Sequence, residues 1–316
     1  MKNKFERICK MTQKNLKKYV STELKKTHPD VQKGDGWVFA KGTFPVLLVA
    51  HLDTVHHELP RNIVYDFDKG TVSSPQGIGG DDRCGILMIL EIVKAYNCSV
   101  LFCEDEEIGC VGAGKFIKTD LAASLEFNYI IEFDRKGSND AVFYECDNPD
   151  FEEFITKEFY KTAYGSMSDI SELAPFLGCA AVNLSCGYYN AHTTKEYVVF
   201  KEMISSMNAA CRILDRTTTE TKFEYIEAEY SYGGWGSYRG GYSKDAWQRY
   251  FKDSYGYEEE EYEKYYMIEF EDENGKTSWY DTYATSKEEA IGIFCISHLN
   301  IPYANVIDIY CMDDER

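Results

Sequence analysis

Histidine and acidic residues recur in this sequence directly after short apolar runs. His51 and Asp53 follow the apolar segment 46–50, and Glu106 and Glu107 belong to four consecutive acids after another such run. In an extended chain, residues two apart face the same side, so Asp53 can support a metal-binding His51 by accepting the second imidazole hydrogen. Four adjacent acids exceed what a helix start explains, and their repulsion calls for cations.

Three further positions fit the same pattern. Asp81 and Asp82 follow three glycines within 77–80, Asp134 ends an apolar run, and His192 follows another. Each position alone has an ordinary structural reading, because aspartates cap helices and a lone histidine is more often structural than a ligand. The glycines favour a binding site over a purely structural role for these residues, since they let a backbone approach closely or take unusual dihedral angles.

The candidate residues share one location, at or after the carboxyl ends of predicted strands. Open α/β sheets bind their ligands at that edge. Two histidines with several carboxylates suit zinc better than magnesium, which prefers oxygen ligands. The carboxylates are numerous enough to build two sites that share a bridge, so the sequence predicts a zinc centre.

Strands and helices alternate through the part of the chain that carries these residues. This alternation predicts an α/β fold whose mixed, mostly parallel sheet is covered by helices on both faces. An amphipathic helix is expected near the N-terminus, with Phe5, Ile8, Leu16, Tyr19, Val20 and Leu24 on its apolar face. The predicted strands are 37–40, 46–50, 63–67, 71–73, 99–103, 129–133, 141–145 and 179–184, and the predicted helices are 84–96, 112–117, 151–160, 169–176 and 200–214.

Composition changes after residue 216. We expect a catalytic domain over 1–216, an acidic linker rich in Tyr and Gly over 217–263, and a small module over 264–316. The module has the pattern of a β-β-α-β unit, in which Ser286 and Glu289 form a capping box at the start of the helix. Nothing in the module predicts catalysis.

Bulk properties exclude several classes of protein. The formal charge of −19 over 316 residues argues against sequence-independent nucleic-acid binding. No apolar run is long enough to span a bilayer, and no signal peptide is evident, so we expect a soluble cytoplasmic protein. The 11 cysteines form no CxxC pair, which favours reduced, mostly buried thiols over zinc held by cysteines.

Five short strings together resemble a known group, the co-catalytic dizinc aminopeptidase and carboxypeptidase superfamily. This superfamily includes bacterial leucyl aminopeptidase, peptidase T and glutamate carboxypeptidase. The order of the strings along the chain also matches. The strings are HLDTV at 51–55, GGDDRCG at 79–85, EDEEIG at 104–109, EFD at 132–134 and AHTT at 191–194.

The resemblance implies a ligand set. One zinc would be held by His51, Asp81 and Asp134, and the other by Asp81, Glu107 and His192, so that Asp81 bridges the pair. Cobalt or manganese are possible substitutes for zinc, because affinity order and metal availability compete.

The resemblance also implies a mechanism. Asp53 would orient His51, and Glu106 would be the general base that activates a metal-bridging water. The peptide bond between Asp81 and Asp82 would be cis, as is frequent in this superfamily. The expected activity is hydrolysis of a peptide bond as an exopeptidase, specifically an aminopeptidase, with a peptide or small amide as substrate.

Carboxypeptidase-type relatives insert a dimerising lid domain between the positions of Asp134 and His192. Here that stretch is short, and residues 165–169 followed by 176–178 resemble the lid-free aminopeptidase branch. Two alternatives stay open. One is an amidohydrolase, deacylase or cyclase on the same scaffold. The other is an inactive binding protein whose C-terminal module recruits a partner.

Overall fold

The chain divides into two compact units, Met1–Ser231 and Tyr232–Arg316. The computed structural model describes residues 1–228, 264–271, 277–284, 290 and 306–311. Within those ranges, no helix is both long enough and apolar enough to cross a membrane. Nine cysteines of the described ranges are free and eight of them are buried, in line with the expected buried thiols.

The first unit is built on an eight-stranded mixed sheet, which confirms the predicted α/β class. Four of its seven strand pairings are parallel, and three of these join the central strands β6, β3, β7 and β10. In spatial order the strands are β1 (Val31–Gly34), β2 (Trp37–Ala40), β6 (Cys98–Cys103), β3 (Phe44–His51), β7 (Tyr129–Arg135), β10 (Ala181–Ser185), β8 (Asp140–Val142) and β9 (Lys161–Ala163).

The central strands are mostly apolar because both faces of the sheet are covered. In β3, Val46, Leu48 and Ala50 pack into one core, whereas Leu47 and Val49 pack into the other. This period-two alternation between two cores explains why these strands read as continuous apolar runs.

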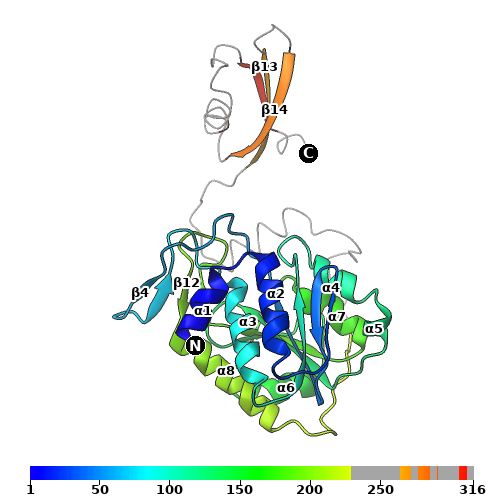
Figure 1. The fold of residues 1–316 in the computed structure, drawn as a ribbon. Helices are drawn as coiled ribbons and strands as arrows, with labels where there is room; N and C mark the ends of the chain where they lie inside the picture. The colour runs from blue at the N-terminus through cyan, green and yellow to red at the C-terminus, as the bar shows by residue number, and fades with distance from the viewer. Residues whose placement is uncertain (229–263, 272–276, 285–289, 291–305, 312–316) are drawn as a thin grey trace. The chain divides into compact units, whose positions relative to one another are not determined.

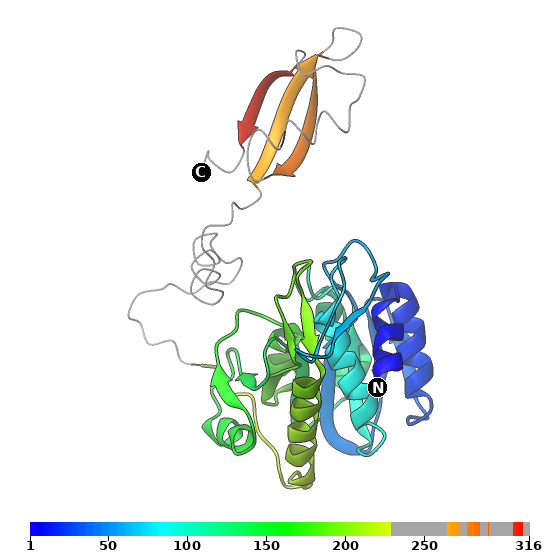
Figure 2. The same ribbon diagram turned by 90° about the vertical axis from the view of Figure 1, so that its left-hand side faces the viewer.

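Helices cover both faces of the sheet, as predicted. Figure 1 shows α1, α2 and α3 side by side, and Figure 2 shows α8 beside α3 on the same face. The helices of this face are α1 (Lys2–Cys9), α2 (Gln13–Leu24), α3 (Gly80–Ile92), α6 (Pro149–Thr156) and α8 (Phe200–Asp215). Those of the other face are α4 (Val111–Phe116), α5 (Asp120–Ala123) and α7 (Asp169–Leu177).

The N-terminal segment forms two helices where one was predicted. The break follows Lys10, and Thr12 caps the second helix by accepting a hydrogen bond from the backbone N of Asn15 at 3.3 Å. Phe5 and Leu16 nevertheless enter the same core. The apolar pattern was therefore interpreted correctly, but the capping threonine that divides it was missed.

A second sheet of four short strands lies in the same unit. Its order is β11 (Tyr188–Tyr189), β12 (Tyr197–Val199), β5 (Thr71–Ser73) and β4 (Val64–Asp66). The predicted hairpin of β4 and β5 is present, and β12 extends it by pairing with β5. Strands β1, β9, β11 and β12 were not predicted, because two to four residues carry too little pattern.

The first unit continues past residue 216, where the domain boundary was predicted, to Ser231. Phe223 packs its ring against Tyr129, Phe151 and Phe154, and its backbone carbonyl accepts a hydrogen bond from the N of Ala180 at 2.9 Å. Isolated bridges at Glu224 and Glu227 continue this contact with the sheet. The rest of the predicted linker lies outside the described residues.

The second unit contains a three-stranded antiparallel sheet in the order β14 (Thr277–Ala284), β13 (Lys264–Glu271), β15 (Val306–Cys311). Tyr266, Ile268 and Phe270 of the middle strand are buried, which is the alternation expected of a strand with one covered face. The helix predicted to open at Ser286 falls, apart from Ala290, outside the described residues.

The packing of Phe223 predicts different stabilities for two truncated chains. A chain that ends at Ala228 keeps this ring, whereas a chain that ends at Arg216 loses it. We expect the shorter chain to be less stable by about 1 kcal/mol or more, since loss of a partly buried aromatic ring removes its apolar contacts. Urea unfolding measures the difference, with Phe223→Ala in the full chain as the matched control. Equal unfolding midpoints for the two truncated chains would contradict this assignment.

Candidate metal centre

The parallel central strands bring the predicted residues to one edge of the sheet. His51 is the last residue of β3, Glu106 and Glu107 follow β6, and Asp134 is the last but one residue of β7. Asp81 reaches the same place from the first turn of α3. Neighbouring parallel strands end at the same edge, so residues far apart in sequence become neighbours.

Two groups of possible ligands meet at Asp81. In the first, His51 Nε2 lies 2.9 Å from Asp81 Oδ1 and 3.3 Å from Asp134 Oδ1. In the second, His192 Nε2 lies 3.2 Å from Asp81 Oδ2 and 3.1 Å from Glu107 Oε2. Within each group the three possible ligand atoms lie within 4.8 Å of one another. One oxygen of Asp81 faces each group.

The donor set fits two cations of the zinc type. Each group offers one imidazole nitrogen and two carboxylate oxygens, which are ordinary zinc ligands. In the described part of the chain, Glu107 Oε1 is a buried oxygen with no hydrogen-bond partner. A buried acceptor without a partner is costly, and a cation would satisfy it.

Negative charge is crowded at this edge. Burial raises the pKa of Glu106 well above its usual value, and the carboxylate of Asp134 raises it further. Burial, together with the charge of Asp81, raises the pKa of Asp134 to about 6. Both pKa values are raised because several carboxylates lie close together in a buried place. Bound cations would lower both values.

Both histidines lie within hydrogen-bond distance of carboxylates. Burial by itself lowers the pKa of His51, but Asp134, Asp53 and Asp81 raise it well above the ordinary value. For His192, hydrogen bonds to Asp81 and Glu107 outweigh burial and raise the pKa to about 11. Both imidazoles are therefore protonated at neutral pH unless a metal takes the place of the proton.

Asp53 ties three parts of the site together. Its Oδ1 lies 3.2 Å from His51 Nδ1 and accepts the backbone N–H of Glu106 at 3.0 Å, while its Oδ2 accepts that of Glu107 at 3.0 Å. Burial opposes ionisation, but the contacts with His51 and the two amides hold the pKa of Asp53 at about 2. Asp53 is thus ionised and lies behind the imidazole of His51, at the place that the sequence predicted.

Asp82 supports the site from the start of α3. The Asp81–Asp82 peptide bond is cis, as the resemblance implied. Asp82 accepts hydrogen bonds from the backbone N of Gly85 at 2.8 Å and of His51 at 3.2 Å. The first bond is the helix cap considered for this residue, and the second joins the helix to β3. Gly85 is required here, since an added Cβ would lie 1.9 Å from the carbonyl oxygen of Phe133.

Several polar residues around Asp134 were not predicted as part of the site. Ser168 Oγ lies 3.2 Å from Asp134 Oδ2 and also donates to the buried Glu132. Tyr188 donates to Asp134 Oδ1 at 3.3 Å, and the backbone N of Asp134 donates to Asn183 Oδ1 at 2.9 Å. The available sequence signals were weak: Ser168 lies in the 165–169 string, and Glu132 lies in the EFD string.

Glu196 is a further buried acid that the sequence analysis missed. It lies four residues after His192 and accepts hydrogen bonds from the backbone of Gly79 and Asp81. Its only local signal is this spacing from a predicted ligand.

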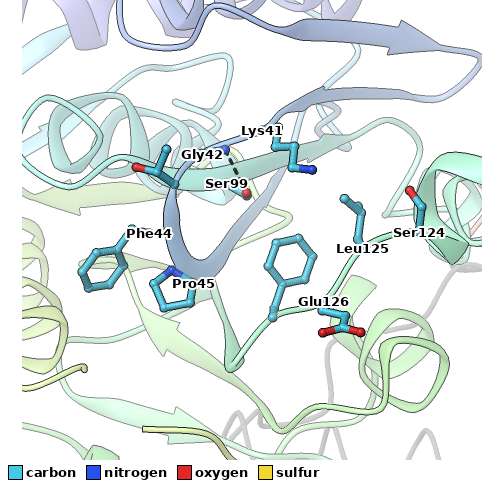
Figure 3. Close-up of a pocket in the computed structure, with 10 residues that line it drawn as sticks. Lys41, Gly42, Phe44, Pro45, Ser99, Ser124, Leu125 and Glu126 are labelled. Atoms are coloured by element: carbon cyan, nitrogen blue, oxygen red, sulfur yellow. Dashed lines mark hydrogen bonds between the residues drawn. The ribbon is translucent and has the colours of Figure 1, made fainter. Parts of the chain in front are cut away.

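A cavity of about 390 Å³ lies at the opposite end of β3 from His51. Phe44, Pro45 and Leu125 line it, and Gly42 N donates to Ser99 Oγ at its rim at 3.0 Å (Figure 3). None of its lining residues belongs to the two ligand groups. The cavity is therefore separate from the candidate metal centre.

Comparison with known proteins agrees with the geometry. Residues 39–178 match the model of peptidase family M28. The aminopeptidase PepT from Bacillus cereus ATCC 10987 is similar in structure, with a TM-score of 0.55 and 14% identity over 67% of this chain and 96% of that chain. A tripeptidase from Staphylococcus aureus subsp. aureus Mu50 gives a TM-score of 0.53 and 12% identity over the same shares of the two chains. A search of curated proteins found no match.

These findings confirm the resemblance to the dizinc exopeptidase superfamily that the five strings indicated. At such low identity the two structures establish the fold, which is that of the zinc exopeptidases. The family match adds support for a hydrolase of the peptidase class.

The bridging position of Asp81 predicts a loss of metal from both groups when this residue is changed. We expect close to two zinc ions per chain in the wild type and a large loss in Asp81→Ala, measured by plasma mass spectrometry after dialysis against zinc. Asp30→Ala, which changes an exposed aspartate, is the control. Zinc at full occupancy in Asp81→Ala would contradict the bridge.

The raised pKa values of the two histidines predict that protons compete with zinc. Each imidazole must lose its proton to bind, so zinc affinity should rise steadily with pH throughout the range below the raised pKa of His192, about 11, and binding at neutral pH should release protons. Calorimetry in buffers of different ionisation enthalpy counts the protons released. An affinity that does not change with pH would show that the histidines are not ligands.

Proposed function

We propose that this protein is a two-zinc metallopeptidase that acts as an aminopeptidase. The observation that carries the proposal is the placement of Asp81, whose two oxygens face His51 in one group and His192 in the other. A carboxylate shared in this way is the arrangement that a two-metal hydrolase needs. The match to peptidase family M28 supports the same conclusion.

The two groups assign the ligands. His51, Asp81 and Asp134 would hold one zinc, and Asp81, Glu107 and His192 would hold the other. Bound zinc would polarise the substrate carbonyl and lower the pKa of the attacking water. Cobalt or manganese are possible substitutes, since the donors accept all three metals.

Glu106 is the proposed general base. It directly precedes the proposed ligand Glu107 and belongs to neither ligand group, so its carboxylate can accept and return a proton. Its backbone is held by Asp53, and its Oε1 lies 3.8 Å from the Cys110 thiol. We assign the proton to Oε2. Glu106 would take it from the attacking water and pass it to the leaving amine.

The absence of a lid supports the aminopeptidase assignment. Residues between Asp134 and His192 build β8, α6, β9, α7 and β10, which are parts of the main sheet and its covering helices, and β11 of the small sheet. They form no separate domain within this fully described stretch. Two of the similar solved structures are an aminopeptidase and a tripeptidase, which favours a peptide substrate with a free amino terminus. A cytoplasmic location stays a prediction.

The role of Glu106 predicts the behaviour of Glu106→Gln. An amide cannot take a proton at this position, so we expect zinc content to stay at the wild-type level while kcat falls by about 10²- to 10⁴-fold. Glu104→Gln is the matched control, because Glu104 pairs with Lys17 and belongs to neither ligand group. Wild-type turnover by Glu106→Gln would overturn the base assignment.

The same assay should use peptides with free and with N-acetylated amino termini. An aminopeptidase cleaves only the free peptides. Release of acetate from the blocked peptides would favour the deacylase alternative. No hydrolysis of either set by zinc-loaded protein would favour the inactive binding protein.

A further inference from the structure

Glu196 is a fully buried carboxylate outside the proposed ligand set. Its side chain has 0% exposed area. Oε1 accepts the backbone N–H of Asp81 at 3.0 Å, and Oε2 accepts that of Gly79 at 2.8 Å. The ring Nε2 of His56 lies 2.8 Å from the same Oε2. A buried carboxylate is costly unless it is paired, so its three contacts must be maintained together.

The three contacts join three separate segments. His56 lies in the loop that follows His51, and Gly79 and Asp81 lie where the chain enters α3. Glu196 itself ends the turn that begins near His192, and its backbone N donates to the carbonyl of Thr193 at 3.1 Å. Each of the three segments therefore contains or adjoins one of the proposed ligands.

The start of α3 is packed tightly against Glu196. A Cβ added to Gly80 would lie 3.2 Å from Glu196 Oε1 and 2.8 Å from atoms of both Tyr188 and Val198. The backbone at this point has no room to move toward the small sheet, and its N–H groups are directed at a fixed acceptor. Asp81 is thus held from behind by both packing and hydrogen bonds.

We propose that Glu196 is a positioning residue of the metal centre. It fixes the backbone of Asp81 so that the two carboxylate oxygens face different metal ions, and through His56 it joins the loops that carry the ligands. This positioning of Asp81 raises the affinity of the centre for zinc. This inference rests on the proposed two-metal function, and it assigns no contact between Glu196 and a metal.

A role in stability alone would have a different signature. In that case, disruption of the Glu196 contacts would lower the unfolding temperature and leave the zinc affinity of the folded protein unchanged. A positioning role lowers the affinity itself, because the bridging carboxylate is no longer preorganised. Outer partners of metal ligands typically contribute about 10- to 100-fold to affinity.

The test is zinc affinity of the full chain by competition with a chromophoric chelator. In Glu196→Gln the amide nitrogen donates and cannot accept, so at least one of the contacts with Asp81, Gly79 and His56 is lost. We expect zinc to bind about 10- to 100-fold more weakly. The matched control is Glu91→Gln on the outer face of α3, which loses ion pairs with Lys4 and Lys94 and should bind zinc as the wild type does.

His56→Ala is the second variant, and it removes only one of the three contacts. We expect a smaller loss of affinity in the same direction, and this variant decides the question if Glu196→Gln does not fold. If the wild type binds two zinc ions and the folded variants bind them as tightly, the positioning role is overturned and the proposed function stands. If the wild type binds no zinc, the proposed function fails and the inference fails with it.

Discussion

The crowding of buried carboxylates at one edge of the main sheet is the constraint on which the rest of this structure depends. Asp81, Glu106, Glu107 and Asp134 meet there because parallel strands end together. Burial strengthens their repulsion, since the surroundings screen charge poorly. The positive charge of the two histidines, or of cations bound in their place, would offset this repulsion. The surrounding loops are organised to keep the arrangement in place.

Carboxylates also serve as ties between loops. Asp53, Asp82 and Glu196 each accept backbone N–H groups from segments distant in sequence, so that each converts a buried negative charge into a structural connection. Buried Arg83 completes this frame by donating to the carbonyl of Asp53 at 3.0 Å. Such contacts fix the ligand-bearing loops before any metal binds, which reduces the cost of organising the site.

Sequence patterns predicted the fold best where an element carries a long and regular apolar pattern. The apolar runs of β3, β6 and β7 and the period of α8 needed no tertiary information. Prediction failed where a contact decides the structure. The polar strand β1, of four residues, forms because it pairs with β2. Residues 217–228 join the first unit because the ring of Phe223 packs against other aromatic rings of that unit.

The candidate residues of the site were readable from the sequence, because metal chemistry restricts the residue types and strand ends restrict their places; their assignment to two metal ions came only from the family resemblance. His51, Asp53, Asp81, Glu106, Glu107, Asp134 and His192 were all named on that basis, and the structure brings them together. Only tertiary structure could add Glu196 with His56, which lie 140 positions apart. Their interaction follows from how loops cross in space, and no local period or spacing records that.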